Sequence, residues 1–176
     1  MYVSSRDLVV TPKHNFSYSL RQNSGDKLMV YKSILVGYDG SKAARKAVEK
    51  ATKLAKVFGA KLIIVTVIPS PVPLVGELLV LDTFKPAEAA QKAKRELEKM
   101  AKELSEIHEI EVEYQVLQGD PAEQLTRYAE EKDCDLIVVG RHGAGRLERL
   151  LLGSVSEKVI RLAEKADVLV VETRGL

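Results

Sequence analysis

Residues 135–158, DLIVVGRHGAGRLERLLLGSVSEK, place an apolar run, a glycine-rich loop and a helix start in direct succession. The run Asp135–Gly140 is apolar in its middle and is bounded by an acid and a glycine, which is typical of a strand buried on both faces. From Ser154 to Glu164, apolar residues return at helical spacing. A buried strand followed by a loop and a helix predicts one βα unit of a parallel sheet.

The same alternation of apolar runs and amphipathic stretches continues toward both ends of the chain. Strands are expected at 33–38, 62–68, 111–117, 135–140 and 167–172, and helices at 41–58, at 86–107, from 121 onward and at 154–164. Strands that alternate with helices form a parallel sheet, because each right-handed crossover lays its helix against the sheet. We therefore expect a single-domain α/β fold: a doubly wound, five-stranded parallel sheet with helices on both faces.

Helix boundary signals agree with this assignment. Ser41 is placed to cap the first helix and Gly59 to end it. Asp120 and Pro121 suit a cap and a first helical residue, and Ser154–Glu157 has the spacing of a capping box. Because ligands of such sheets bind beyond the carboxyl ends of the strands, the residues that follow the first, second and fourth strands are the candidates for a site.

The composition suits one domain, and the charge balance gives no overall positive potential that would attract nucleic acid. The chain has 176 residues, of which 45% are hydrophobic and 30% charged. Its formal net charge of +2 comes from residues 1–28, and the remainder has equal numbers of acids and bases, so we expect no nucleic-acid partner. No apolar run approaches the roughly 18 residues of a spanning helix, so we expect a cytoplasmic protein with no membrane partner.

Two segments fall outside the alternation. Residues 1–28 are polar and aperiodic, and we interpret them as a flexible N-terminal extension of a domain that spans residues 29–176. A partner-contacting arm and an upstream start before Met29 are the alternatives. The proline-rich stretch between Pro69 and Pro86 is expected to form a loop or lid.

The glycine-rich stretch after the fourth strand is the candidate ligand site. Gly140, Gly143 and Gly153 lack a Cβ, which lets backbone N–H groups approach phosphate oxygens. The helix that begins near Ser154 adds unpaired N–H groups and the positive end of its dipole. Together these features predict a phosphate-binding cradle. The competing interpretation is a loop in which the glycines serve only the backbone conformation.

Two better-known phosphate motifs do not fit this stretch. Gly140 and Gly145 have the spacing of a P-loop, but Arg146 and Leu147 follow where that motif needs Lys and Ser or Thr. The dinucleotide fingerprint fails as well, because its third glycine position is Glu148 and the loop follows the fourth strand rather than the first.

The motif residues resemble those of the universal stress protein family. Nucleotide-binding members carry Gly, two residues, Gly, nine residues, then Gly followed by Ser or Thr, and Gly140, Gly143, Gly153 and Ser154 fit every position. The first strand with its turn, Ile34–Ser41, and the fourth strand are also similar, so the resemblance covers about residues 30 to 173. It implies a Rossmann-like fold of the adenine nucleotide alpha hydrolase type, with strand order 3-2-1-4-5.

The resemblance also implies an adenine-nucleotide ligand: ATP, or ADP or AMP, with or without Mg²⁺. Tyr38 and Asp39 end the first strand, and Asp39 would reach the ribose hydroxyls or a metal-associated phosphate. The backbone of Val67 would meet the adenine edge. The phosphates would be surrounded by Gly140, Arg141, Gly143, Gly153, Ser154 and Val155. A simple turn residue remains the other interpretation of Asp39.

The expected function is that of a nucleotide-responsive binding module in the stress response. The resemblance implies a homodimer through the last strand, whose outer edge at Val168–Val171 needs a cover. The alternatives are slow ATP hydrolysis or phosphoryl transfer, with Asp39 positioning a metal near Ser154, and a nucleotide-free dimeric scaffold. No catalytic residue is assigned, because His142 has no orienting carboxylate at recognisable spacing.

Overall fold

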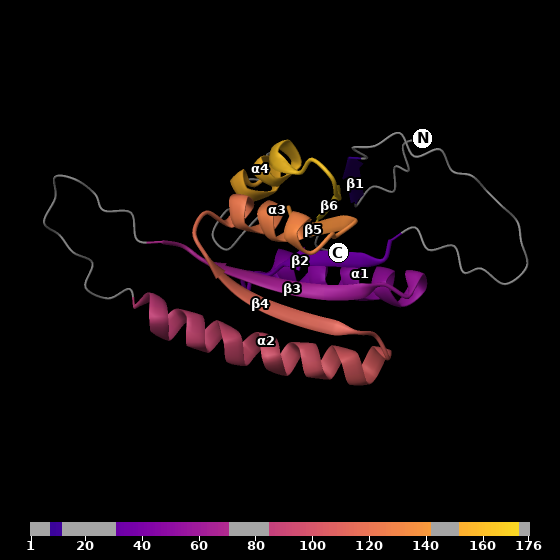
Figure 1. Cartoon of the computed structure of the whole chain (residues 1–176), viewed down its shortest axis with the longest axis horizontal. Helices are drawn as coiled ribbons and strands as arrows, with labels where there is room; N and C mark the ends of the chain where they lie inside the picture. Colours follow the sequence, from indigo (N-terminus) through magenta and orange to yellow (C-terminus); the bar gives the residue numbers. More distant parts are fainter. Residues whose placement is uncertain (1–7, 12–30, 71–84, 142–151, 173–176) are drawn as a thin grey trace, which may run out of the picture.

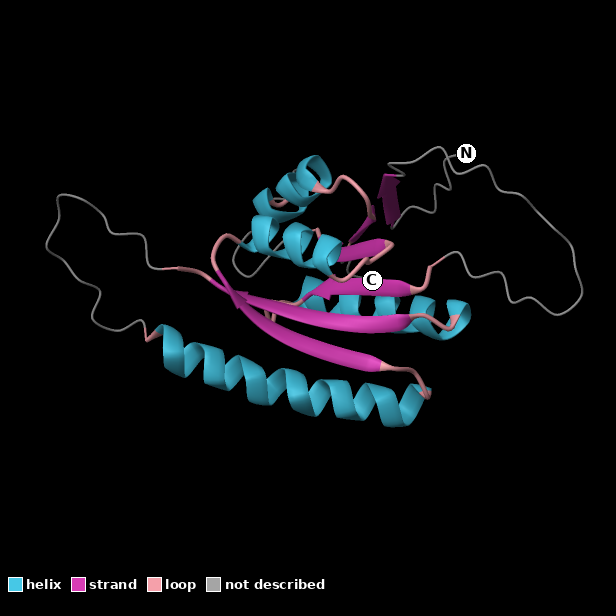
Figure 2. Cartoon of the chain, viewed as in Figure 1, coloured by secondary structure: helices cyan, strands magenta, loops and turns pink. Residues whose placement is uncertain are grey.

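The five predicted strands form one parallel sheet (Figures 1 and 2). The computed structural model describes residues 8–11, 31–70, 85–141 and 152–172. The parallel strands are β2 (Ser33–Gly37), β3 (Lys61–Ile68), β4 (Val112–Gln118), β5 (Leu136–Gly140) and β6 (Asp167–Val171). They lie in the order β4-β3-β2-β5-β6, which confirms the expected order 3-2-1-4-5.

The helices within the described ranges cover both faces of this sheet. They are α1 (Lys42–Phe58), α2 (Pro86–His108), α3 (Pro121–Glu131) and α4 (Ser154–Leu162). None of them combines the length and the apolar character needed to cross a bilayer.

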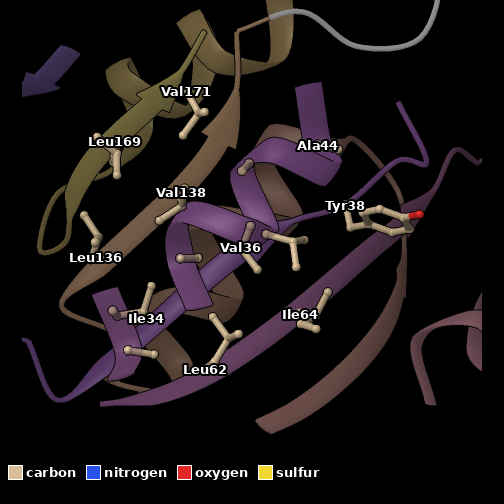
Figure 3. Packing of buried hydrophobic residues seen from close by; sticks show 14 of the residues in the cluster. Ile34, Val36, Tyr38, Ala44, Leu62, Ile64, Leu136, Val138, Leu169 and Val171 are labelled. Atoms are coloured by element: carbon tan, nitrogen blue, oxygen red, sulfur yellow. The ribbon is translucent and has the colours of Figure 1, made fainter. Parts of the chain in front are cut away.

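Successive residues of β2 point to opposite faces of the sheet and so build two cores. Ile34 and Val36 are fully buried with residues of α1 and α2, and Figure 3 shows them along β2 with Tyr38 at its far end. Leu35, between them, is fully buried with residues of α3 and α4. Burial on both faces is what the continuous apolar runs predicted.

The helix boundary signals act largely as the sequence predicted. Ser41 caps α1, because its Oγ accepts the Ala44 N–H at 3.0 Å, and Gly59 ends the helix in the left-handed conformation at φ 69°. Asp120 caps α3 by accepting the Glu123 N–H at 3.0 Å. These caps fix where each helix leaves its strand and therefore where the loops at the strand ends begin.

A further strand, which the sequence analysis did not predict, pairs with β6. β1 (Leu8–Thr11) runs antiparallel to it, with Leu8 opposite Val171 and Thr11 opposite Val168. The structure thus places one paired strand within residues 1–28, the segment interpreted from sequence as an N-terminal extension. The β1 sequence, LVVT, is short but rich in β-branched residues, and such residues favour strands when a sheet edge is available.

β1 occupies the edge at which a second copy was expected to pair. Each residue of 168–171 lies opposite a residue of β1. Because an edge strand has one open side, β6 cannot pair there with β1 and with a second copy at the same time. A homodimer through Val168–Val171 requires β1 to leave, and it stays a prediction.

Proline at both Val9 and Val10 should release β1. Alternate N–H groups of an antiparallel strand point to its partner, so one of two adjacent residues donates to β6 and the double substitution removes that bond. The uncovered β6 edge should then pair with another chain, and analytical ultracentrifugation should detect a concentration-dependent dimer.

The double variant with Thr at both positions is the matched control, because threonine keeps the N–H groups and the β-branched shape. It should sediment as the unchanged protein does. A proline variant with the same mass as the unchanged protein at every concentration would contradict the role of β1 as an edge cover.

Candidate functional site

A cavity lies where the carboxyl ends of β2, β3 and β5 meet the starts of α1, α3 and α4. Its volume is about 130 Å³, smaller than the roughly 300–1,000 Å³ of a complete ligand pocket. It is lined by Gly37, Tyr38, Asp39, Ser41, Ala44, Val65, Val67, Pro121, Leu125, Val139, Gly140 and Val155. This is the position at which the strand order reverses and at which ligands bind in such sheets.

The structure brings most of the predicted site residues to this cavity or next to it. Those that line it are Tyr38, Asp39, Val67, Gly140 and Val155. Arg141 and Ser154 are adjacent in sequence to lining residues and Gly153 lies two residues before Val155, but none of the three is among the lining residues. Gly143, and His142 to which no catalytic role was assigned, lie outside the described residues.

Alternation along β3 directs the peptide groups of Val67 into the cavity. The carbonyl of Val65 accepts the Tyr38 N–H at 2.8 Å on the β2 side, whereas the carbonyl of Ile68 accepts the Gly119 N–H at 3.0 Å on the β4 side. Val67 lies two residues after Val65, and alternate residues of a strand direct their peptide groups to the same side, so the N–H and C=O of Val67 point to the β2 side. Because β2 ends at Gly37, they face the cavity beyond the end of that strand.

The start of α4 differs from the capping box expected at Ser154–Glu157. The N-cap is Gly153, one residue earlier, and no side chain caps the helix. Ser156 does not face outward: it is 1% exposed, and its hydroxyl donates to the Gly153 carbonyl at 2.9 Å. The first-turn N–H groups, with the helix dipole behind them, remain suited to an anion from outside the chain.

Gly140 has a packing role that the phosphate interpretation did not include. A Cβ at this position would lie 2.8 Å from the Cβ and 2.9 Å from the carbonyl carbon of Ala43. Contacts this short with a backbone atom are not tolerated without a shift. The missing side chain therefore lets the end of β5 pack directly against the first turn of α1.

Asp39 forms a turn and also faces the cavity. Its Oδ1 accepts the Ser41 N–H at 2.9 Å, which is the local turn that the alternative interpretation described. The residue is exposed and lines the cavity, so it lies at the cavity rim. Both interpretations of Asp39 are thus compatible with one geometry.

Tyr38 forms a fixed wall of the cavity. The side chain is 5% exposed, and its hydroxyl donates to Glu96 Oε1 at 2.7 Å. Burial, followed by the neighbouring Glu96 carboxylate, raises the pKa of Tyr38 to about 12. Arg45 donates to the same hydroxyl at 3.4 Å. The phenol therefore stays neutral and ties the end of β2 to α1 and α2.

The sequence analysis missed the apolar part of the cavity. Val65 and Val139 come from strands, and Pro121 and Leu125 come from the start of α3. A usable signal existed, because Pro121 directly follows the capped turn after β4 and therefore belongs to the same end of the sheet. The described residues contain no group of three or more His, Cys, Asp and Glu placed to hold a metal ion.

Fold and cavity together define a doubly wound α/β protein with a cavity at the reversal of strand order. The family model of the universal stress proteins matches residues 30–172. The chain belongs to the universal stress protein family.

Individual relatives agree with this assignment. A universal stress protein of Methanocaldococcus jannaschii is 37% identical over 148 residues, which are 81% of this chain and 83% of the relative. The solved structure of the universal stress protein UspA from Lactobacillus plantarum superposes with a TM-score of 0.67 at 25% identity, over 80% of this chain and 97% of that one. A universal stress protein solved in complex with cAMP superposes with a TM-score of 0.59 at 28% identity, over 82% of this chain and 99% of that one.

Alanine at Gly140 should destabilise the fold because its Cβ would press on the α1 backbone. We expect the free energy of unfolding to fall by about 1–3 kcal/mol, the usual effect of overpacking, as measured by urea denaturation. Gly37→Ala is the matched control, because its Cβ would meet the side-chain end of Leu125 at 3.0 Å rather than backbone. Equal losses in the two variants would contradict the packing role of Gly140.

Proposed function

We propose that this protein binds an adenine nucleotide, with ATP as the first candidate, in the cavity at the carboxyl ends of β2, β3 and β5. The observation that carries the proposal is that the cavity has two chemically different sides. One is apolar and holds the peptide edge of Val67. The other carries the start of α4, which has no side-chain cap. A nucleotide has the matching polarity, with a flat base at one end and anionic phosphates at the other.

The apolar side suits a flat heterocycle. Val65, Leu125 and Val139 supply aliphatic walls, and the peptide groups of Val67 supply one donor and one acceptor between them. The Watson–Crick edge of adenine presents a donor beside an acceptor, so it can pair with one donor and one acceptor of a peptide edge. The Val67 peptide edge is therefore compatible with adenine, and the choice of adenine among the bases rests on the glycine motif shared with nucleotide-binding family members.

The α4 side suits phosphate. The exposed Ser154 and Val155 follow the Gly153 cap, and Val155 reaches the cavity. A helix of this length presents first-turn N–H groups and a partial positive charge to an anion. Asp39, which also lines the cavity, is proposed to accept hydrogen bonds from sugar hydroxyls.

The comparison with the complex of a related protein supports the same ligand class. That protein, 28% identical to this chain, was solved with cAMP, which contains adenine, ribose and phosphate. Our choice of ATP for this chain rests on the glycine motif together with the two-sided cavity, and the number of phosphates is part of the proposal.

We further propose that the output of binding is conformational. A ligand that joins the end of β3 to the start of α4 links elements on both sides of the strand-order reversal, and such a link shifts the population of states that a partner recognises. Catalysis is not part of the proposal, since Asp39 is engaged by its own turn and no described histidine or lysine lines the cavity.

Aspartate at Ser154 should weaken ATP binding by charge alone. A carboxylate in the first turn of a helix stabilises that helix, so the fold should be kept, but it opposes the phosphates. By isothermal titration calorimetry we expect ATP affinity to fall roughly tenfold, which corresponds to about 1.4 kcal/mol.

Ser154→Asn, which has nearly the same shape without the charge, is the control and should stay close to the unchanged protein. Adenosine, which has no phosphate, should bind the Asp and Asn variants equally. Equal ATP affinity in both variants would show that the start of α4 does not contact the phosphates. The whole proposal would be overturned if the unchanged protein bound none of ATP, ADP and AMP at millimolar concentration.

A further inference from the structure

We propose that Arg141 is a positioning residue that holds the start of α4 in place, and that its guanidinium is not a phosphate ligand. This inference rests on the proposed nucleotide site and concerns how that site is held. It changes the role expected for Arg141 from the family resemblance. Four contacts between described residues meet at Arg141.

The carbonyl of Arg141 joins the end of β5 to the start of α4. It accepts the Gly153 N–H at 2.8 Å and the Ser156 hydroxyl at 3.1 Å. Ser156 is buried, and its one hydroxyl hydrogen is shared between the carbonyls of Arg141 and Gly153. Two residues of the α4 start thus converge on one oxygen at the end of β5. We call this set, Arg141, Gly153 and Ser156, the neck.

The neck is anchored to the end of β6. The Arg141 N–H donates to the Val171 carbonyl at 2.9 Å, and the guanidinium forms an ion pair with Glu172. The two side chains of this pair are only 19% and 21% exposed. A pair so sheltered from water is screened less than an exposed one, and loss of one partner leaves the other charge poorly solvated.

This anchoring bears directly on the ligand site. Gly140 lines the cavity immediately before Arg141, and Val155 lines it two residues after Gly153. A shift of Arg141 therefore moves two walls of the cavity relative to each other. Ligand contacts depend on such second-layer support, because a displacement of about 1 Å can cost a large factor in affinity or rate.

The guanidinium has a partner that is not the ligand. It is paired with Glu172, which neutralises it, and Arg141 is not among the residues that line the cavity. A direct phosphate contact would require the side chain to leave a sheltered ion pair. The two roles therefore make opposite predictions for removal of Glu172.

Three variants of the full chain separate these roles: Glu172→Ala, Arg141→Gln and Ser156→Ala. If Arg141 positions α4, each variant loosens the neck, and ATP affinity measured by calorimetry falls at least about threefold in each. The Arg141→Gln/Glu172→Ala double variant should bind ATP no more weakly than the weaker-binding of its two single variants, because both changes remove the same ion pair. The Ser156 variant matters because it changes no charge. Arg161→Gln, at the far end of α4, is the charge control and should bind ATP as the unchanged protein does.

The inference is overturned if removal of Glu172 leaves ATP affinity unchanged or raises it. If Arg141 is a phosphate ligand, loss of Glu172 frees its charge and ATP binds equally well or more tightly, while Arg141→Gln alone loses affinity. ATP binding that is unchanged in all three neck variants would also overturn it.

A second measurement keeps this test separate from the proposed function. Amide hydrogen exchange of the nucleotide-free protein reports the Gly153 N–H, which donates to the Arg141 carbonyl. We expect faster exchange at Gly153 in the three neck variants and not in Arg161→Gln. Faster exchange together with no ATP binding by the unchanged protein would reject the nucleotide site and keep the neck. Unchanged exchange in a protein that binds ATP would reject the neck and keep the site.

Discussion

The pairing of β2 with β5 is the interaction on which the rest of the structure depends. Residues Ile34–Val36 lie in register beside Leu136–Val138, although about a hundred residues separate them. This contact joins the two halves of the sheet and makes the strand order reverse there. The loops that follow β2 and β5 then part to opposite faces, and the space between them becomes the cavity. Gly140 allows α1 to close one side of it, because no Cβ keeps the helix away.

The sequence predicted what depends on periodicity and local caps. Strands that are buried on both faces have continuous apolar sequences, so the alternation of strands and helices could be predicted. Ser41, Gly59 and Asp120 marked helix boundaries, because each forms a capping hydrogen bond close to its own position in the chain. The strand β1 was missed because its four residues stand in a polar segment, and pairing with β6 depends on an edge contributed by the far end of the chain. Long-range pairing of that kind leaves no periodic signal.

The sequence predicted where the residues of the candidate site lie better than it predicted what each residue does. Residues at the strand ends were found because their place in a parallel sheet follows from the topology. Roles that depend on a distant partner were not: Arg141 pairs with Glu172, and Tyr38 with Glu96, across sequence separations of 31 and 58 residues. The cap of α4 is Gly153 rather than Ser154, and Ser156 turns inward to the backbone. In each case a contact that no local pattern encodes decided what the side chain does.

The central claim is that an adenine nucleotide spans the cavity from the end of β3 to the start of α4. A titration of the isotopically labelled protein with ATP, followed by amide NMR shifts, tests it most directly. The account predicts saturable shifts of the Val67, Ser154 and Val155 amides and none at Ala60, which lies at the opposite end of the sheet. Shifts confined to another surface, such as the groove between α1 and α2 beside Met100, would contradict it.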